Sequence, residues 1–214
     1  MKEKVLSNLE ILPFFTKTAM TVLEKVHPKT LDYNISSWVK KGLIIRLKNG
    51  LYVTKTFIDR NLREGYYLGL VAGRLVTPSY LSLEYVLQKN GLLTEATYTI
   101  SSITIKTTRR YFNKLGAFTY TTIKPSLYFG YKRVSYGNNF FYEAEVSKAL
   151  FDYFYMRLAN YSPEDPRPIE EERINWSNVN RKEFKNFVAI IRKSKIKRMI
   201  KLIPLLEDIY GDSH

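Results

Sequence analysis

The sequence has no cysteine among its 214 residues and only two histidines, His27 and His214. Without cysteine the chain forms neither a disulfide nor a zinc site with thiolate ligands, which fits a reducing compartment such as the cytoplasm. Two histidines, of which one is the last residue, cannot supply a histidine-based metal centre or catalytic triad. We therefore predict that the protein carries no metal ion and no cofactor.

Long hydrophobic runs are missing too. The longest, from Tyr66 to Val76, is interrupted by Arg74 and is too short to span a bilayer. The first residues, MKEKVLSNLE, contain no apolar segment of the kind found in signal peptides. We therefore predict a soluble, cytoplasmic protein that does not contact membranes.

Positive charge, in contrast, is abundant, with 34 Lys and Arg against 20 Asp and Glu and a net charge of +14. This balance favours a polyanionic partner, either nucleic acid or an anionic membrane surface. The charge is distributed unevenly along the chain. Residues 1–60 contain eleven Lys and Arg and five acidic residues, whereas residues 173–203 contain ten Lys and Arg and one acidic residue. The acidic stretch 164–172, with three prolines in or beside it, predicts an extended linker.

The first 60 residues show three helical patterns followed by a hairpin pattern. The apolar stripes are Val5, Leu9 and Leu12, then Met20, Leu23 and Val26, then Leu31, Ile35, Trp38 and Val39. Pro13 ends the first helix, Thr16 or Thr18 can cap the second, Pro28 begins the third and Gly42 ends it. The runs LIIRL and LYVTK on either side of Asn49-Gly50 predict a tight hairpin with a type I′ turn.

Three short helices and a two-stranded ribbon are the order found in winged helix-turn-helix proteins, whose third helix enters the major groove of DNA. If Leu31, Ile35 and Val39 face inward, the opposite side of this helix is a candidate reading surface. There we expect Asn34 to pair with adenine and the lysines to neutralise phosphates. The predicted DNA-binding residues are Lys29, Thr30, Tyr33, Asn34, Ser37, Lys40 and Lys41 on the helix, and Arg46, Lys48 and Asn49 on the hairpin. The alternative is an ordinary solvated helix face beside a basic turn.

The remaining residues, 61–214, predict a mixed α/β domain, so the fold class is α+β with two domains. Gly65, Gly69 and Gly73 recur every four residues and predict close packing of one helix. The sheet is expected to be mainly antiparallel, with a bulge at Ser101-Ser102 where the alternation changes phase. The predicted segments are helices beginning at Tyr66, at Ser82 and near residue 144, strands at 97–106, 118–124, 127–136 and 139–142, the linker 161–172, and a basic helical tail at 173–214.

Two charged groups in this second domain leave more than one interpretation open. The cations of the tail can form a solvated face, a second phosphate-binding surface or a surface for an acidic protein partner. They are Arg192, Lys193, Lys195, Lys197, Arg198 and Lys201. A second group, Glu143, Glu145, Lys148 and Asp152, contains residue types that occur in metal-dependent nucleases, but its spacing is unusual for such sites. Because Lys148 and Asp152 are four residues apart on a helix, a salt bridge accounts for them, and we predict no enzymatic activity.

Three stretches follow one another in an order seen in a known family. They are WVKKGLIIRLKNGLYV, TPSYLSLEYVLQKNGLL, and FGYKRV with the later EAEVSKALFDYFY. They resemble the helix and wing, the Tyr-x-Ser segment with its His/Asn-Gly-Leu turn, and the A-x-P-E-K-A-L-x-D helix of the AbiEi antitoxins, from type IV toxin–antitoxin and phage-defence (abortive infection) operons. The likeness covers about residues 1–157. The chain departs from the family pattern at Val146-Ser147, where the family usually has Pro-Glu, and keeps Lys148 and Asp152.

This resemblance implies a protein with two activities, neither of them enzymatic. Its winged helix-turn-helix would bind inverted repeats in its own promoter and repress transcription. Its C-terminal domain would act as an antitoxin against a nucleotidyltransferase-like toxin. The alternative is a protein-interaction module, or a transcriptional regulator that neutralises no toxin.

Overall fold

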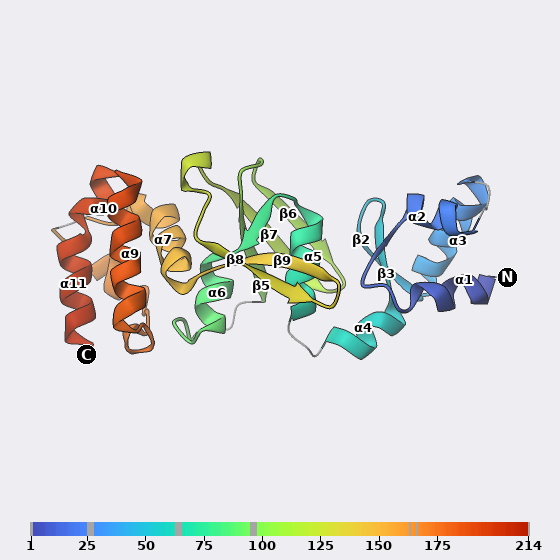
Figure 1. The fold of residues 1–214 in the computed structure, drawn as a ribbon, viewed down its shortest axis with the longest axis horizontal. Coiled ribbons are helices and arrows are strands. Elements are labelled where there is room, and N and C mark those ends of the chain that lie inside the picture. The colour runs from blue at the N-terminus through green and yellow to red at the C-terminus, as the bar shows by residue number, and fades with distance from the viewer. Residues whose placement is uncertain are drawn as a thin grey trace.

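The computed structural model describes residues 2–24, 28–62, 66–94, 98–162, 164–165 and 167–213, which fold as a mixed α+β protein. Figure 1 shows an elongated molecule, with the N-terminal elements at one end, a sheet in the middle and the C-terminal helices at the other end. Val26 and His27, at the predicted end of the second helix, lie outside the described residues. Among the helices described, none is both long and apolar enough to cross a membrane.

The N-terminal end contains three helices and a small sheet. These elements are α1 (Lys2–Leu9), β1 (Phe15–Thr16), α2 (Lys17–Glu24), α3 (Pro28–Lys40), β2 (Ile44–Lys48) and β3 (Leu51–Thr54). The strands are antiparallel in the order β1-β3-β2. Thr16 caps α2 by accepting a hydrogen bond from the Ala19 amide at 3.1 Å, as the sequence predicted. Both the three helices and the hairpin were therefore predicted correctly.

The central sheet has six strands in the order β6-β7-β5-β4-β9-β8. Its members are β4 (Ser79–Leu81), β5 (Thr99–Thr104), β6 (Arg109–Asn113), β7 (Gly116–Thr122), β8 (Tyr131–Tyr136) and β9 (Asn139–Ala144). The pairs β4–β9 and β5–β7 are parallel and the other three pairs are antiparallel. The sheet is therefore mixed, with three antiparallel pairs out of five, in agreement with the mainly antiparallel sheet that the sequence predicted.

The bulge predicted at Ser101-Ser102 is wrong. Strand β5 pairs with β7 in an unbroken register from Thr99 to Thr104. Because β5 lies inside the sheet, residues on both of its faces are buried, and the sequence does not need to alternate. The alternation of apolar and polar residues is interrupted at Ser101-Ser102 because both faces of the strand are buried, and not because of a bulge.

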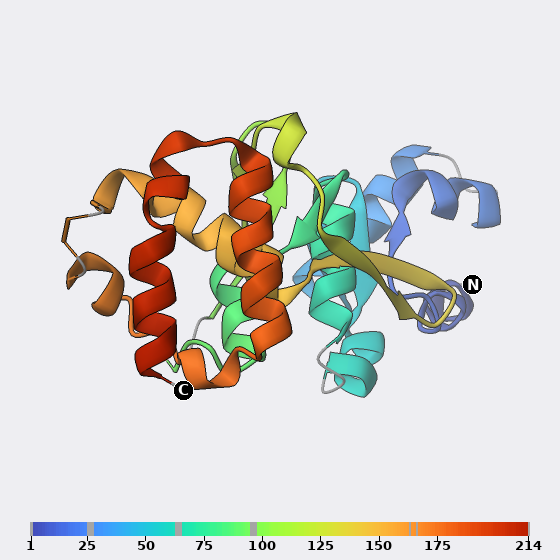
Figure 2. The same ribbon diagram turned by 60° about the vertical axis from the view of Figure 1, so that its left-hand side comes forward.

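The helices of the second part cover the sheet and extend the molecule beyond it. They are α4 (Lys55–Asn61), α5 (Tyr66–Leu75), α6 (Leu83–Lys89), α7 (Val146–Arg157), α8 (Arg167–Glu170), α9 (Arg181–Ser194), α10 (Lys197–Lys201) and α11 (Ile203–Asp212), with 3-10 turns at Pro125–Leu127, Leu158–Asn160 and Trp176–Asn178. Helix α5 packs against β9 and α7 packs against α9. Helices α9 and α11 lie side by side at the end of the molecule in both views (Figures 1 and 2).

Two buried clusters divide the core, and the β2–β3 hairpin contributes to both. The small cluster joins α1, α2 and α3 to Ile44 and Tyr52 of the hairpin. The large cluster contains Leu47, Leu51 and Val53 of the same hairpin together with the sheet and the C-terminal helices. The hairpin is therefore held between the N-terminal helices and the rest of the molecule.

The segment predicted to be an extended linker packs against the protein along its described part. Tyr161 and Ile169 are each 1% exposed and belong to the large core. The Glu172 carboxylate accepts a hydrogen bond from the Tyr161 hydroxyl at 2.6 Å. Pro163 and Pro166 lie outside the described residues. An acidic, proline-rich composition alone did not reveal the apolar anchors at Tyr161 and Ile169.

Close packing explains Gly69, one of the three regularly spaced glycines, and it predicts a loss of stability. A methyl group on Gly69 would lie 2.6 Å from Cε2 of Phe141 in β9. We therefore expect Gly69→Ala to lower the free energy of unfolding by about 1–3 kcal/mol, measured by urea titration. A methyl group on Gly211 in α11 meets no atom within 4 Å. Gly211→Ala should instead raise the stability by about 0.5–1 kcal/mol, and equal effects at both sites would contradict this packing role.

Candidate nucleic-acid interface

Helix α3 presents one face to the small core and the opposite face to solvent. Leu31, Ile35 and Trp38 are 2%, 3% and 5% exposed and pack in the small cluster. Their spacing of three and four residues places them on one side of the helix. The residues between them therefore determine what the helix can offer to a partner.

The outward face of α3 carries most of the residues predicted to contact DNA. The exposed ones are Lys29, Thr30, Tyr33, Lys40 and, just after the helix, Lys41. Tyr33 is 70% exposed, which is unusual for so large a side chain. Ser37 is half-buried, whereas Ser36, which was not among the predicted residues, is exposed.

Asn34 is a correction to the predicted reading surface. It is only 9% exposed and faces the small core. The reason is its position, three residues after Leu31 and four before Trp38, which places it within the buried stripe. Helical spacing could have excluded Asn34, and adenine recognition by this side chain is not supported.

An ion pair between α2 and α3 neutralises Asp32, an acidic residue near this face. The Lys17 ammonium lies 2.6 Å from the Asp32 carboxylate, and both side chains are partly exposed. An exposed pair of this kind contributes little to stability, on the order of 1 kcal/mol at most. Its consequence here is electrostatic. Because Lys17 neutralises Asp32, the carboxylate lowers the positive potential of the neighbouring lysines less than an unpaired carboxylate would.

A tight turn at Gly42 joins α3 to the hairpin. The Gly42 amide donates to the Val39 carbonyl at 3.1 Å, and the Leu43 amide donates to the Trp38 carbonyl at 2.9 Å. Gly42 has a φ of 70°, a value that disfavours residues with a Cβ. These two bonds form a Schellman cap, so Gly42 ends the helix as predicted and sets the direction of β2 relative to α3.

The hairpin is tight, as predicted, but its turn is not type I′. A type I′ turn needs positive φ at both central residues, whereas Gly50 has a φ of 76° and Asn49 does not have a positive φ. The register instead shifts between Arg46 and Lys48, which marks a bulge. Arg46 and Asn49 are exposed, and the Arg46 guanidinium lies 5.9 Å from the centre of the Tyr52 ring.

Lys48 is a second correction, because its ammonium is bound within the protein. Its Nζ donates to the carbonyl oxygens of Arg74 at 3.1 Å and Leu75 at 2.7 Å, in the last turn of α5. Burial lowers the pKa of Lys48, and the positive charges of Lys106, Arg109 and Arg74 lower it further. A cation at a helix C-terminus also interacts favourably with the helix dipole. Lys48 therefore docks the hairpin on α5 and does not project from the hairpin tip.

All six cations predicted in the tail are exposed, and four of them also have local contacts or backbone roles. Lys193 lies 4.8 Å from the centre of the Phe129 ring, and Arg198 donates to the carbonyl oxygens of Ala159 and Tyr161 at 3.2 and 2.8 Å. Lys195 ends α9 with a left-handed φ of 56°. The Arg192 guanidinium lies 4.0 Å from the Glu207 carboxylate. Three of these residues therefore contact the protein through their side chains, and Lys195 ends a helix through its backbone conformation.

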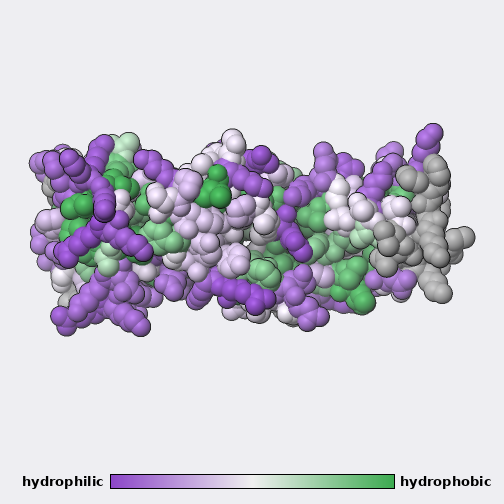
Figure 3. All heavy atoms as spheres, turned by 45° about the horizontal axis from the view of Figure 1, so that its top comes forward, coloured by the Kyte–Doolittle hydropathy of each residue, from purple (hydrophilic) through white to green (hydrophobic). Residues whose placement is uncertain are grey.

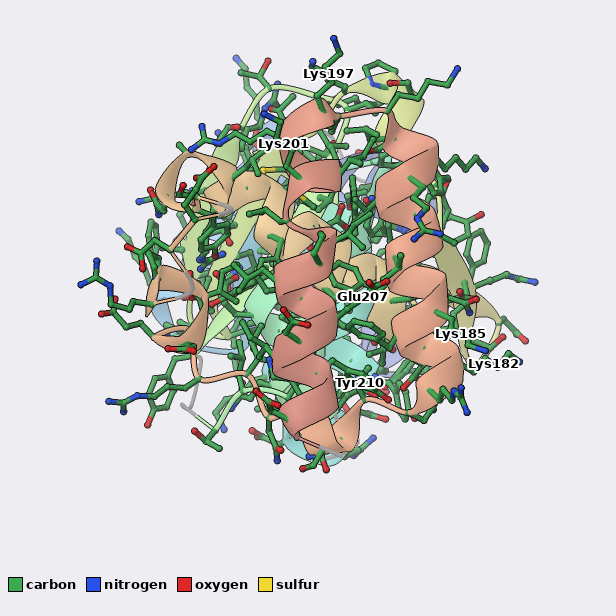
Figure 4. All side chains as sticks on the ribbon, turned by 90° about the vertical axis from the view of Figure 1, so that its left-hand side faces the viewer. Lys182, Lys185, Lys197, Lys201, Glu207 and Tyr210 are labelled. Atoms are coloured by element: carbon green, nitrogen blue, oxygen red, sulfur yellow. The ribbon has the colours of Figure 1, made fainter. Side chains whose placement is uncertain are left out.

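The exposed cations at this end come from both ends of α9 and from α10. Lys197 and Lys201 project from α10, while Lys182 and Lys185 project from the first turns of α9 (Figure 4). Hydrophilic side chains gather over these C-terminal helices in Figure 3. Lys182 and Lys185 were not among the predicted residues, because the cations are denser in the run after residue 190.

Glu143, Lys148 and Asp152, three of the four charged residues singled out around α7, are used in two separate ion pairs. The Lys148 ammonium pairs with Asp152, and both side chains are fully buried, so the predicted salt bridge is confirmed. Tyr80 and Ser82 also donate to the Asp152 carboxylate, at 3.0 and 2.8 Å. Glu143 instead accepts a hydrogen bond from Lys89 at 2.7 Å. Lys148, Asp152, Tyr80 and Ser82 therefore form a buried network that joins α7 to β4 and to the start of α6.

Comparison of the sequence with models of protein families finds no match, and neither does comparison with curated proteins.

Proposed function

We propose that residues 1–60 form a winged helix-turn-helix that binds duplex DNA, and that the chain represses its own operon in this way. The observation that carries the proposal is the outward face of α3, where Tyr33, Lys40 and Lys41 are exposed directly before a basic hairpin. In winged helix-turn-helix proteins the third helix lies in the major groove and the hairpin contacts the flanking backbone. The two lysines would neutralise phosphates, and Thr30 and Tyr33 would reach base edges or the backbone.

The antitoxin activity is the second part of the proposal. It is supported by the three stretches whose order resembles the AbiEi family, the last of which contains Lys148 and Asp152. A nucleotidyltransferase-like protein encoded beside this gene would support it further. The competing proposal is a protein-interaction module, in which the N-terminal elements and the basic C-terminal helices contact proteins.

Binding to the DNA upstream of its own gene is the result that tests the first part. We expect the purified chain to prefer this duplex over a scrambled duplex in a gel-shift titration. The logarithm of the affinity should fall linearly with the logarithm of the salt concentration, because phosphate contacts release counterions. The preference for the native duplex should persist at both a low and a high salt concentration.

The same titration separates the two proposals. Weak binding that disappears equally for the native and the scrambled duplex would leave only a basic protein with nonspecific affinity. That outcome would favour the protein-interaction module.

A further inference from the structure

Four cationic side chains from four separate segments lie near the place where strand β2 of the hairpin packs against β6 of the six-stranded sheet. They are Lys48 of β2, Arg74 of α5, Lys106 in the turn after β5, and Arg109 of β6, which we call the junction cluster. Strand β2 packs against β6, and the Asn113 side chain donates to the Leu47 carbonyl at 3.2 Å. The cluster is therefore built by long-range packing.

Within the described residues, the four side chains of the junction cluster form no ion pair with an acidic side chain. Over the described part of the chain, no Asp or Glu lies within 4.0 Å of the charged atoms of these four residues. Lys48 is held by helix carbonyls, and the Arg74 guanidinium lies 4.5 Å from the centre of the Phe14 ring. Their like charges repel one another, so a polyanion that bridges them would relieve this repulsion.

We propose that the junction cluster binds phosphate groups of duplex DNA next to those contacted by α3 and the tip of the hairpin. This inference rests on the proposed function. Lys106 and Arg109 are exposed and can reach a phosphate, while Lys48 and Arg74 add positive potential behind them. Because Lys48 ties the hairpin to α5, a duplex contacted by the hairpin meets the sheet edge as well. The footprint on DNA then extends beyond that of the N-terminal elements.

Arg110, the next residue of β6, provides a matched control. Arg109 lies opposite Tyr120 and Arg110 lies opposite Thr119, so the two arginines are on different faces of the sheet. The Tyr120 hydroxyl donates to the Ala72 carbonyl at 2.7 Å, which identifies the face of Arg109 as the one covered by α5. Both arginines are exposed, and replacing either removes the same charge from the same strand.

The test compares Lys106→Ala/Arg109→Ala with Lys106→Ala/Arg110→Ala on the native upstream duplex. We expect the first variant to bind roughly tenfold more weakly at low salt, with a salt slope smaller by about 2, because two phosphate contacts are lost. In the second variant the salt slope should decrease by only about half as much, because one phosphate contact is lost. Hydroxyl-radical footprinting should show that the first variant loses protection on one flank only, while the central protection remains. Thermal unfolding verifies that both variants are folded.

The outcomes separate this inference from the proposed function. If the wild-type chain binds its native duplex specifically and both variants lose the same affinity and slope, the junction cluster has no role and the proposed function stands. If the wild-type chain shows no preference for the native duplex, the proposed function and this inference fall together. Loss of central protection in the first variant would also overturn the inference, because the cluster would then not act on a flank.

Discussion

Replacing both Lys40 and Lys41 with alanine is expected to weaken binding to the upstream duplex roughly tenfold at low salt, since two phosphate contacts are lost. Both side chains are exposed at the end of α3, where they extend its outward face. The slope of log affinity against log salt should decrease by about 2, and the preference for the native over the scrambled duplex should change little. Fluorescence anisotropy at several salt concentrations measures both quantities.

The matched control is Lys182→Ala/Lys185→Ala, which removes the same charge from α9 at the opposite end of the molecule (Figures 1 and 4). We expect this variant to bind DNA nearly as the wild-type chain does, because these charges lie far from α3 and are screened by salt. Equal losses in the two variants would mean that net charge alone drives the binding. In that case α3 would have no special role.

The N-terminal elements could be predicted because their signals are local. Pro28 begins α3, Gly42 ends it, and an apolar stripe with helical spacing defines its buried face. The same spacing also contained the information that Asn34 is buried, but the chemistry of its amide suggested a role in base recognition. The polar side chain of Asn34 suggested exposure, but its position on the buried side of the helix determines its burial.

The junction cluster could not be predicted, because its members come together only through tertiary packing. Lys48 contacts carbonyls 26 and 27 residues away, and β6 was not recognised as a strand. Two adjacent arginines and the exposed Phe112 make β6 look like a polar loop. It is an edge strand, for which charged residues are a common way to prevent pairing with other chains.

The pair Lys148–Asp152 shows a mixed result, because its spacing predicted the contact but not the burial. An i,i+4 pair on a helix is usually a surface salt bridge. Here α7 lies between the sheet and α9, and Lys148 and Asp152 are both 0% exposed. Burial lowers the pKa of Lys148 and raises the pKa of Asp152, since each charged form has lost its water. Recognition of this burial requires the topology that places α7 in the interior.

We expect Lys148→Ala to lower the free energy of unfolding by about 3–5 kcal/mol, because it leaves the Asp152 carboxylate buried without its cation. The hydrogen bonds from Tyr80 and Ser82 remain and satisfy only part of the carboxylate. The matched control is Lys55→Ala in α4, which removes an i,i+4 bridge to Asp59 of 2.7 Å between side chains that are 60% and 57% exposed. The free energy of unfolding of that variant, measured by the same urea titration, should fall by less than about 1 kcal/mol. Similar losses for the two lysines would show that the buried pair is neutral or hydrated, and that α7 is held in place by its apolar contacts alone.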